Sequence, residues 1–198
     1  MCRMILPIMA YGLPVLRKEC EEIDENSDIS SLVNDMFETM YASSGVGLAG
    51  PQIGKSERIF IVDASPFAEP EEGEKMTDNR KILKDFKKVF INPIIEDETG
   101  DVWPFSEGCL SIPGIREDVE RRSIVKISYY DENWNFHEES FTGIAARIIQ
   151  HEYDHIEGVL FTDHLKPLKR RLLKRKLDDI SKGKVDVDYK MKFPKIKR

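Results

Sequence analysis

The stretch QHEYDHIEG, residues 150–158, places His151 and His155 four positions apart, with Glu152 beside the first. In an α-helix, residues i and i+4 lie on the same face, so two imidazoles at this spacing can bind one metal ion. Glu152 would lie next to the ligands without being one of them, where a general base can act on a bound water molecule. The alternative is an ordinary solvated helix, because the stretch is polar overall.

The residues just before this stretch favour a buried helix. The segment TGIAARII, residues 142–149, is mostly small and apolar. Burying the four polar side chains of HEYDH together would be costly unless they were paired with one another or bound to a metal ion. We therefore predict a helix over 142–158 that lies inside the fold and carries a metal site. The role of Asp154 stays open, as support for a ligand histidine or as an ordinary polar residue.

Two histidines are too few for a catalytic metal site, which needs a third protein ligand. Metalloproteases with this motif take it from downstream, where the candidates are Glu157, Asp163 and His164. Upstream, the segment EGCLS places Cys109 in a turn of small residues, and a thiolate with two imidazoles suits zinc or iron and leaves a position for water. A cysteine in such a turn can equally be inert packing. The residues alone leave these alternatives open.

The rest of the chain predicts an α+β fold. Apolar periodicity and turn residues predict these elements: a helix over 28–45, a glycine-rich loop over 45–54, a strand over 58–64, a polar excursion over 65–88 that ends in a short helix, a strand over 89–96, a turn-rich stretch over 102–117, a hairpin over 122–141 that turns at DENWN, and a basic helix over 166–180. We expect mostly antiparallel strands around a central helix that carries the HEYDH motif, plus a C-terminal helix. From Ser181 onward the chain is polar, and we expect it to be loosely held.

Composition and charge narrow the class of protein. The chain has 198 residues, a net charge of −6 and three cysteines, which is too few for a disulfide scaffold. No long apolar run or signal peptide is visible, so we expect a cytoplasmic protein with no membrane span and no DNA partner. The charge is uneven: residues 166–198 carry +10 and the remainder carries −16. A basic segment of this kind favours contact with an acidic partner such as RNA.

Three segments together resemble a known family. GVGLAGPQIG (45–54), EGCLS (107–111) and QHEYDHIEG (150–158) are similar, in this order, to the three signature motifs of peptide deformylase. The segments YGLPVLRKE and FINPII also look like that family. The resemblance runs from about residue 4 to about residue 165. It implies a catalytic domain over 1–165, followed by a basic C-terminal helix and tail over 166–198.

The resemblance implies an activity and a set of roles. The family is a group of metal-dependent hydrolases that remove the N-formyl group from the N-terminal formylmethionine of newly made polypeptides and release formate. By this similarity Cys109, His151 and His155 bind one divalent metal ion, with Fe²⁺ expected in the cell and Zn²⁺, Ni²⁺ or Co²⁺ possible in purified protein. The remaining roles implied are the general acid–base Glu152, the formyl-oxygen contacts Gln52 and the Leu110 N–H, the peptide contacts Val46 and Gly47, the methionine-pocket residues Val46, Ile144 and Ile148, the pocket-mouth residue Arg116, and the bracing pair Glu107 and Arg121.

The resemblance also implies a partner and has one departure. Deformylases dock near the ribosomal exit through a C-terminal helix, so we expect the basic helix of this chain to contact the ribosome. His137 and His164 are expected not to be metal ligands. The departure is Gly50, where the family usually has alanine. Glycine adds backbone freedom, and we expect a small local adjustment there with no loss of chemistry.

Overall fold

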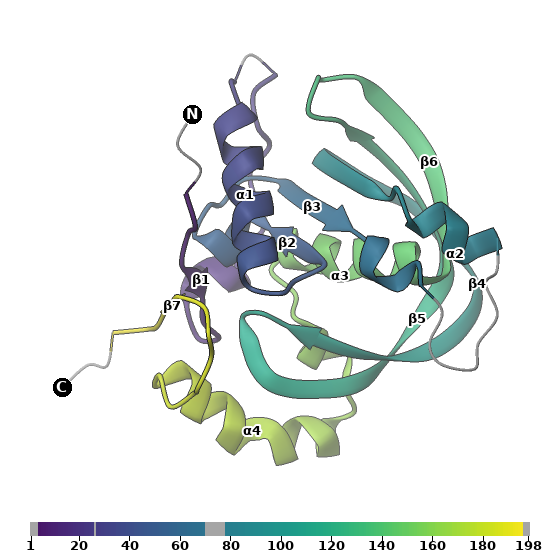
Figure 1. Ribbon diagram of the computed structural model, residues 1–198. Helices are drawn as coiled ribbons and strands as arrows, with labels where there is room; N and C mark the ends of the chain where they lie inside the picture. Colours follow the sequence, from purple (N-terminus) through teal and green to yellow (C-terminus); the bar gives the residue numbers. More distant parts are fainter. Residues whose placement is uncertain (1–3, 26, 70–77, 196–198) are drawn as a thin grey trace.

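The structure, a computed structural model, describes residues 4–25, 27–69 and 78–195. A five-stranded antiparallel sheet has the order β2-β3-β4-β5-β6, and β1 pairs with β7 in a small parallel sheet (Figure 1). The strands are β1 (Ile8–Met9), β2 (Gly47–Ala49), β3 (Ile59–Asp63), β4 (Lys87–Cys109), β5 (Ile112–Tyr130), β6 (Phe136–Thr142) and β7 (Met191–Lys192). The helices are α1 (Ser30–Ala42), α2 (Asp78–Leu83), α3 (Gly143–Ile156) and α4 (Pro167–Ser181). This confirms the predicted α+β class, with the HEYDH motif on α3.

Strand β3 separates two halves of the hydrophobic core. Every residue of β3 is buried, because helices cover both faces of the sheet at this point. Ile59 and Ile61 pack in a cluster with the apolar side chains of α1, whereas Phe60 and Val62 pack in a cluster with those of α3. Successive side chains of a strand point to opposite faces, which accounts for this division. Figure 1 shows α1 in front of β2 and β3, with α3 behind them.

The β4–β5 hairpin is much longer than the sequence predicts. We expected a turn-rich stretch over 102–117, but these residues form the two paired arms of the hairpin on either side of a tight turn at Leu110 and Ser111. Strand β3 pairs with β4 only up to Ile91, so the distal part of β4 has a free edge where Pro104 is tolerated. Pro113 and Gly114, which suggested a turn, instead accompany a register shift of the hairpin, opposite the step from Gly108 to Cys109.

The glycine-rich loop is more regular than expected. It contains β2 and a 3-10 turn (Gly50–Ile53). A Cβ atom at Gly50 would lie 2.6 Å from the carbonyl oxygen of Glu57, so no larger residue fits without movement of the backbone. The departure from the family is therefore explained by the close approach of the 55–57 segment, and not by a need for backbone freedom at Gly50.

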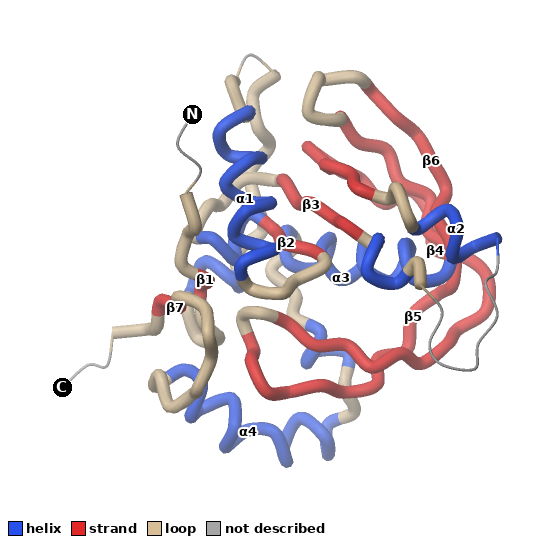
Figure 2. The backbone as a smooth tube through the Cα atoms, in the orientation of Figure 1, coloured by secondary structure: helices blue, strands red, loops and turns tan. Residues whose placement is uncertain are grey.

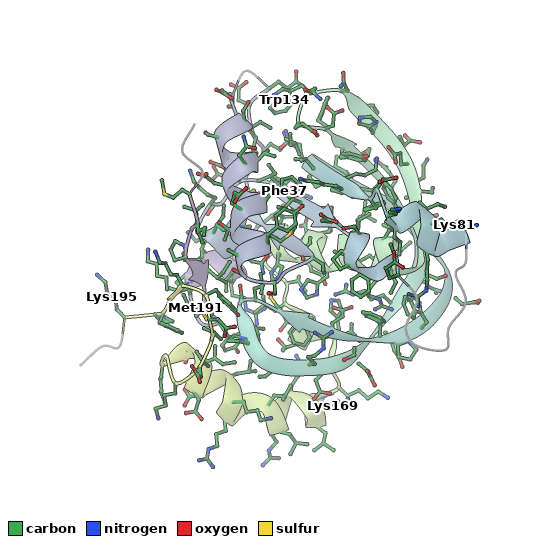
Figure 3. The ribbon with its side chains drawn as sticks, viewed as in Figure 1. Phe37, Lys81, Trp134, Lys169, Met191 and Lys195 are labelled. Carbon is green, nitrogen blue, oxygen red and sulfur yellow. The ribbon has the colours of Figure 1, made fainter. Side chains whose placement is uncertain are left out.

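The end of the chain is also better ordered than expected. Residues 182–192 do not lie loosely on the surface: they return beside the N-terminal segment, where β7 pairs with β1 (Figure 2). Figure 3 labels Met191 on this returning strand, and Met191 packs with Val185 and Phe193 against the cluster beneath α4. The alternation of apolar and charged residues in VDVDYKMKF is the pattern of an extended, half-covered segment.

The polar excursion over 65–88 ends in α2, as predicted. Part of it, 70–77, lies outside the described residues, as does Cys2. Cys20 is buried in the core and carries a free thiol, in keeping with the plain role expected for it. Among the described residues, no helix is both long and apolar enough to cross a membrane.

Candidate metal centre

Two distant parts of the chain meet at a cluster of metal-binding side chains. Cys109 lies at the tip of the β4–β5 hairpin, while His151 and His155 lie one turn apart on α3. One ligand atom from each of these three residues lies within 4.8 Å of the others. The Cys109 Sγ atom is 3.2 Å from His155 Nε2, and the two imidazole rings are 5.1 Å apart at nearly right angles. The sequence therefore predicted the three residues that the fold brings together.

The chemistry of these donors fits a divalent metal ion. Burial opposes ionisation of Cys109, but the charge of His155 and the hydrogen bonds of both histidines outweigh it and hold the pKa of this thiol well below its usual value. Burial lowers the pKa of His151, but its hydrogen bonds to Cys109 and Glu107 outweigh burial and raise it. The surroundings of Cys109 thus favour its ionised form, the thiolate, with a positive charge beside it. A thiolate is the form of cysteine that binds metals, and a bound metal cation would supply the positive charge.

Glu107 fixes the orientation of His151. The carboxylate oxygen Oε2 of Glu107 lies 2.9 Å from His151 Nδ1, which leaves Nε2 as the nitrogen available to a metal. Arg121 donates two hydrogen bonds to Glu107, at 2.7 and 3.0 Å, as the predicted bracing pair requires. Arg147 donates a third at 3.0 Å. Burial raises the pKa of Glu107, but the hydrogen bonds and charges of His151 and Arg121 outweigh burial and hold this pKa well below its usual value.

Asp154 supports the same network from outside. Its carboxylate lies 2.8 Å from the Arg121 guanidinium and 2.7 Å from His164 Nε2. Of the two readings left open by the sequence, the structure favours a supporting role, exerted through Arg121 and Glu107 on His151. His164 contacts Asp154 and lies outside the cluster of three metal-binding residues.

Glu152 is buried beside the ligands without a hydrogen-bond partner for one of its oxygens. Its side chain is 4% exposed, and Oε2 has no partner among the described residues. Burial is the main cause that raises the pKa of Glu152 to about 7, although His151 and His155 oppose the shift. A Cβ atom at Gly47 would lie 2.3 Å from Glu152 Oε1. Glycine is therefore required at 47 because the carboxylate packs directly on its backbone.

A cavity of about 540 Å³ opens beside this cluster. Of the residues predicted for substrate contact, those that line it are Val46, Gly47, Gln52, Leu110, Arg116 and Ile148. Ile144 does not line it and packs against the core cluster beneath the sheet. Gln52 is held in place by its own loop: its Oε1 accepts a hydrogen bond from the Ala49 N–H at 2.8 Å, and its Nε2 lies 3.4 Å from Cys109 Sγ.

Sequence reasoning missed several residues of the cavity wall. These are Phe67, Phe105, Ile115, Arg147 and the tail segment 186–189. Arg147 is 1% exposed and lies in a helical turn that looked merely small and apolar. Its position four residues before His151 was the available signal, because i and i+4 share a helix face. For the tail segment, the sequence shows only an alternation of apolar and charged residues. This alternation does not indicate which part of the protein the segment packs against.

Comparison with known proteins identifies the family. The family model described as "Polypeptide deformylase" matches residues 5–171. The chain belongs to the polypeptide deformylase family. A peptide deformylase of Christiangramia forsetii is 56% identical over 98% of this chain and 99% of its own, and one of Cytophaga hutchinsonii is 54% identical over 96% and 98%.

Solved deformylase structures share the fold. A peptide deformylase from Arabidopsis thaliana matches with a TM-score of 0.76 and 32% identity, covering 93% of this chain and 98% of its own. One from Plasmodium falciparum matches with a TM-score of 0.74 and 37% identity, covering 89% and 95%. The chain is thus a deformylase enzyme, a metal-dependent hydrolase that removes N-formyl groups from nascent peptides, and its fold brings Cys109, His151 and His155 together.

Proposed function

We propose that this deformylase hydrolyses the formyl group of N-terminal formylmethionine, with release of formate, in the cavity beside Cys109, His151 and His155. The observation that carries the proposal is the pairing of a complete ligand set with a buried carboxylate, that of Glu152, which has an oxygen free to bind a proton. Few structural networks leave a buried carboxylate unpaired, because an unsatisfied buried polar group costs about 1–3 kcal/mol, and a charged group costs more.

Cys109, His151 and His155 would hold one divalent metal ion. When bound, such an ion lowers the pKa of a water molecule and supplies a nucleophile at neutral pH. A thiolate and two imidazoles suit Fe²⁺, Zn²⁺, Ni²⁺ and Co²⁺, and we propose Fe²⁺ as the ion in the cell. The orientation of His151 by Glu107 serves the ligand role whichever ion is present.

Glu152 is proposed as the proton carrier. Burial raises its pKa to about 7, so the carboxyl can both accept and return a proton near neutral pH. In the forward reaction it would take a proton from the attacking water molecule and later deliver it to the amine nitrogen of the departing peptide. Contact with Gly47 limits the movement of the carboxylate between these two tasks.

Gln52 and Leu110 are proposed to stabilise the negative charge that develops on the formyl oxygen. Gln52 Nε2 lies against Cys109 Sγ, with the amide fixed through Ala49, so the donor needs little reorganisation. The Leu110 N–H follows Cys109 at the hairpin tip. Loss of one such donor typically costs about 3 kcal/mol of transition-state stabilisation.

The cavity wall supplies groups that would bind the peptide. The Val46 carbonyl already accepts a hydrogen bond from the Asp63 N–H at 2.9 Å. We therefore propose that Val46 contacts the substrate peptide through its N–H, next to the backbone of Gly47. Ile148 would form one wall of the methionine pocket, whereas Ile144 is assigned to core packing. Arg116 is exposed at the mouth and donates a hydrogen bond to the Ser106 carbonyl at 2.7 Å.

A zinc endopeptidase is the alternative use of an HEYDH helix, and its third ligand would come from downstream. The three candidates are engaged elsewhere: Glu157 pairs with Arg58, Asp163 with Arg17, and His164 with Asp154. The cluster of three ligands found among the described residues uses Cys109 instead. The contacts therefore favour the deformylase reaction over a protease.

We further propose that α4 contacts the ribosome, in the cytoplasm. Leu168 and Leu172 are 69% and 73% exposed, while Leu173 and Leu177 face the core. An exposed leucine pair among basic side chains offers both apolar and electrostatic contact to a ribosomal surface. Charge-reversal at Arg171 and Arg175 should weaken salt-dependent ribosome binding and leave hydrolysis of a short formyl-peptide unchanged. Unchanged binding would contradict the contact.

The activity itself is tested by formate release from formyl-Met-Ala-Ser under anaerobic conditions, with metal analysis of the same sample. We expect about one metal ion per chain, because Cys109, His151 and His155 form the one ligand cluster among the described residues, and we expect formate release to follow metal content. Metal-loaded protein that releases no formate would contradict the proposal. The same assay after loading with Zn²⁺ or Fe²⁺ would show which ion supports the faster reaction.

A further inference from the structure

The C-terminal segment 184–190 supplies one wall of the cavity beside the metal centre through its residues 186–189. Asp186, Val187, Asp188 and Tyr189 line the cavity together with the hairpin tip and Glu152. Along the segment Val185, Val187 and Tyr189 are half-buried, while Asp186 and Asp188 are exposed. The apolar side chains therefore attach the segment to the protein and leave two carboxylates at the rim of the opening.

Specific hydrogen bonds hold the segment in this place. The Tyr189 hydroxyl donates to the carbonyl oxygen of Leu110 at 2.8 Å. Directly after it, the Ile8 N–H donates to Lys190 O at 2.8 Å, at the start of the β1–β7 pairing. The Tyr11 N–H donates to Ser111 O at 2.9 Å. Both terminal segments thus hold the hairpin tip on which the third metal ligand lies.

The rim has an uneven charge. Neither Asp186 nor Asp188 has an ion-pair partner within the part of the chain that the structure describes. Arg116, which also lines the cavity, lies on β5. Inside the same cavity, Glu152 presents a buried carboxylate oxygen that has no hydrogen-bond partner in the described part of the chain, which marks where polar groups of a ligand are expected. Asp186 and Asp188 line the same cavity, so a peptide bound beside Glu152 lies in the same cavity as the two aspartates.

This wall lies beyond the part of the chain that the family model matches, which ends at residue 171. The Christiangramia forsetii deformylase aligns over 98% of this chain, so its alignment takes in the segment. Any effect of the segment on substrate choice is thus additional to what the matched family region provides.

We infer that the segment 184–190 is a specificity wall, on which Asp186 and Asp188 favour nascent chains with a basic side chain shortly after the formylated methionine and disfavour acidic ones. The inference rests on the proposed function. A formylated N-terminus carries no charge of its own, so the nearest charges of the substrate are side chains at its second and third positions. Two unpaired carboxylates at the rim attract cationic side chains there and repel anionic ones.

The test measures kcat/KM on two matched sets of formyl-peptides. One set is formyl-Met-Lys-Ser, formyl-Met-Gln-Ser and formyl-Met-Glu-Ser, and the other moves the variable residue to the third position. We expect the lysine peptide of at least one set to exceed the glutamate peptide by about threefold to tenfold at low salt. The double variant Asp186→Asn/Asp188→Asn should bring this ratio close to one, and so should high salt with the unchanged enzyme.

A matched control removes two exposed carboxylates that do not line the cavity, in the variant Glu98→Gln/Asp101→Asn. This control should keep the lysine-to-glutamate ratio. No charge preference in either set, or a preference that survives in the Asp186→Asn/Asp188→Asn variant, would overturn the inference alone. Failure of the unchanged, metal-loaded enzyme to release formate from formyl-Met-Ala-Ser would overturn the proposed function and the inference with it.

Discussion

Helices α3 and α4 are similar in length and both carry many charged residues, yet they use their charges in opposite ways. In α3 the side chains of Arg147, His151, Glu152 and His155 are buried. In α4 the buried residues are Leu173, Leu177 and Ile180, and the basic side chains remain in solvent. Buried charges must be paired or bound to a ligand, whereas solvated charges are free to meet a partner. The buried charges of α3 are therefore suited to a reactive site, whereas the solvated charges of α4 are suited to contact with a partner.

The largest loss of metal binding and activity is expected from replacing Cys109, the ligand that the hairpin tip adds to the two histidines of α3. Cys109→Ala should abolish stoichiometric metal binding and with it formyl-peptide hydrolysis, because two imidazoles alone bind divalent ions weakly. Metal analysis and formate release on the same sample check this. The matched thiol control is Cys20→Ala, which removes a buried thiol outside the cluster. A Cys109→Ala protein that keeps its metal would support the endopeptidase alternative instead.

Glu152→Gln should spare the metal and slow the reaction. The amide keeps the size of the side chain but cannot carry the proton, so kcat should fall by about a hundredfold to ten-thousandfold. Steady-state formate release with parallel metal analysis measures both properties. Glu120→Gln, at an exposed position of β5, is the charge-matched control. Full activity of the Glu152→Gln enzyme would remove Glu152 from the mechanism.

Glu107 tests how strongly the buried charges of α3 depend on one another. Replacing it with glutamine leaves Arg121 and Arg147 without their shared carboxylate, and loss of one member of a buried ion pair typically costs about 3–5 kcal/mol of unfolding free energy. Urea unfolding measures this loss. A change below about 1 kcal/mol would mean that the network contributes little to stability.

The same residue predicts a pH dependence with a definite sign. The pKa of Glu107 is lowered in the folded protein, since the hydrogen bonds of His151 and Arg121 outweigh the effect of burial. Its contribution to stability is therefore complete above its ordinary pKa of 4.5 and decreases as the pH falls below that value. The Glu107→Gln variant should show a flatter decline in stability over this acid range than the unchanged enzyme.

Gly47→Ala should disturb catalysis through Glu152. The added methyl group would overlap the carboxylate, and overpacking of this kind costs about 1–3 kcal/mol, or about tenfold to a hundredfold in rate if the cost falls on the transition state. A double-mutant cycle with Glu152→Gln in formate-release assays separates this effect from general damage. The second substitution should add little to the first if both act on the same group. Additive losses would contradict the coupling.

The sequence predicted the metal-binding residues better than it predicted the secondary structure around them. The spacing of His151 and His155 fixes a shared helix face because it is a local pattern, whereas Cys109 was implied only by the resemblance to the deformylase family. The long hairpin was missed because Pro104 and Gly108 suggest turns, whereas the free edge that tolerates them exists only in the folded sheet. Strand β3 was predicted correctly because an unbroken apolar run can be read from neighbouring residues alone.

Contacts between distant segments account for the rest of what was missed. Tyr189 meets Leu110 across 79 positions of sequence, and no local pattern reports such a contact. The need for glycine at 50 likewise comes from the carbonyl of Glu57 in the fold. The leucine periodicity of α4 likewise marks an apolar face without saying how much of it a neighbouring element covers, and the fold leaves Leu168 and Leu172 exposed.

The smallest effect is expected at the ion pair that joins α4 to the hairpin. Lys169 Nζ lies 2.6 Å from a Glu117 carboxylate oxygen, but the lysine side chain is 48% exposed, so solvent screens the pair. A double-mutant cycle with Lys169→Gln and Glu117→Gln should give a coupling of about 0.2–1 kcal/mol in urea unfolding, and less at high salt. The cycle of Glu107→Gln with Arg121→Gln should give several times more, since both partners are buried. Equal couplings would mean that burial is not what distinguishes the charges of α3 from those of α4.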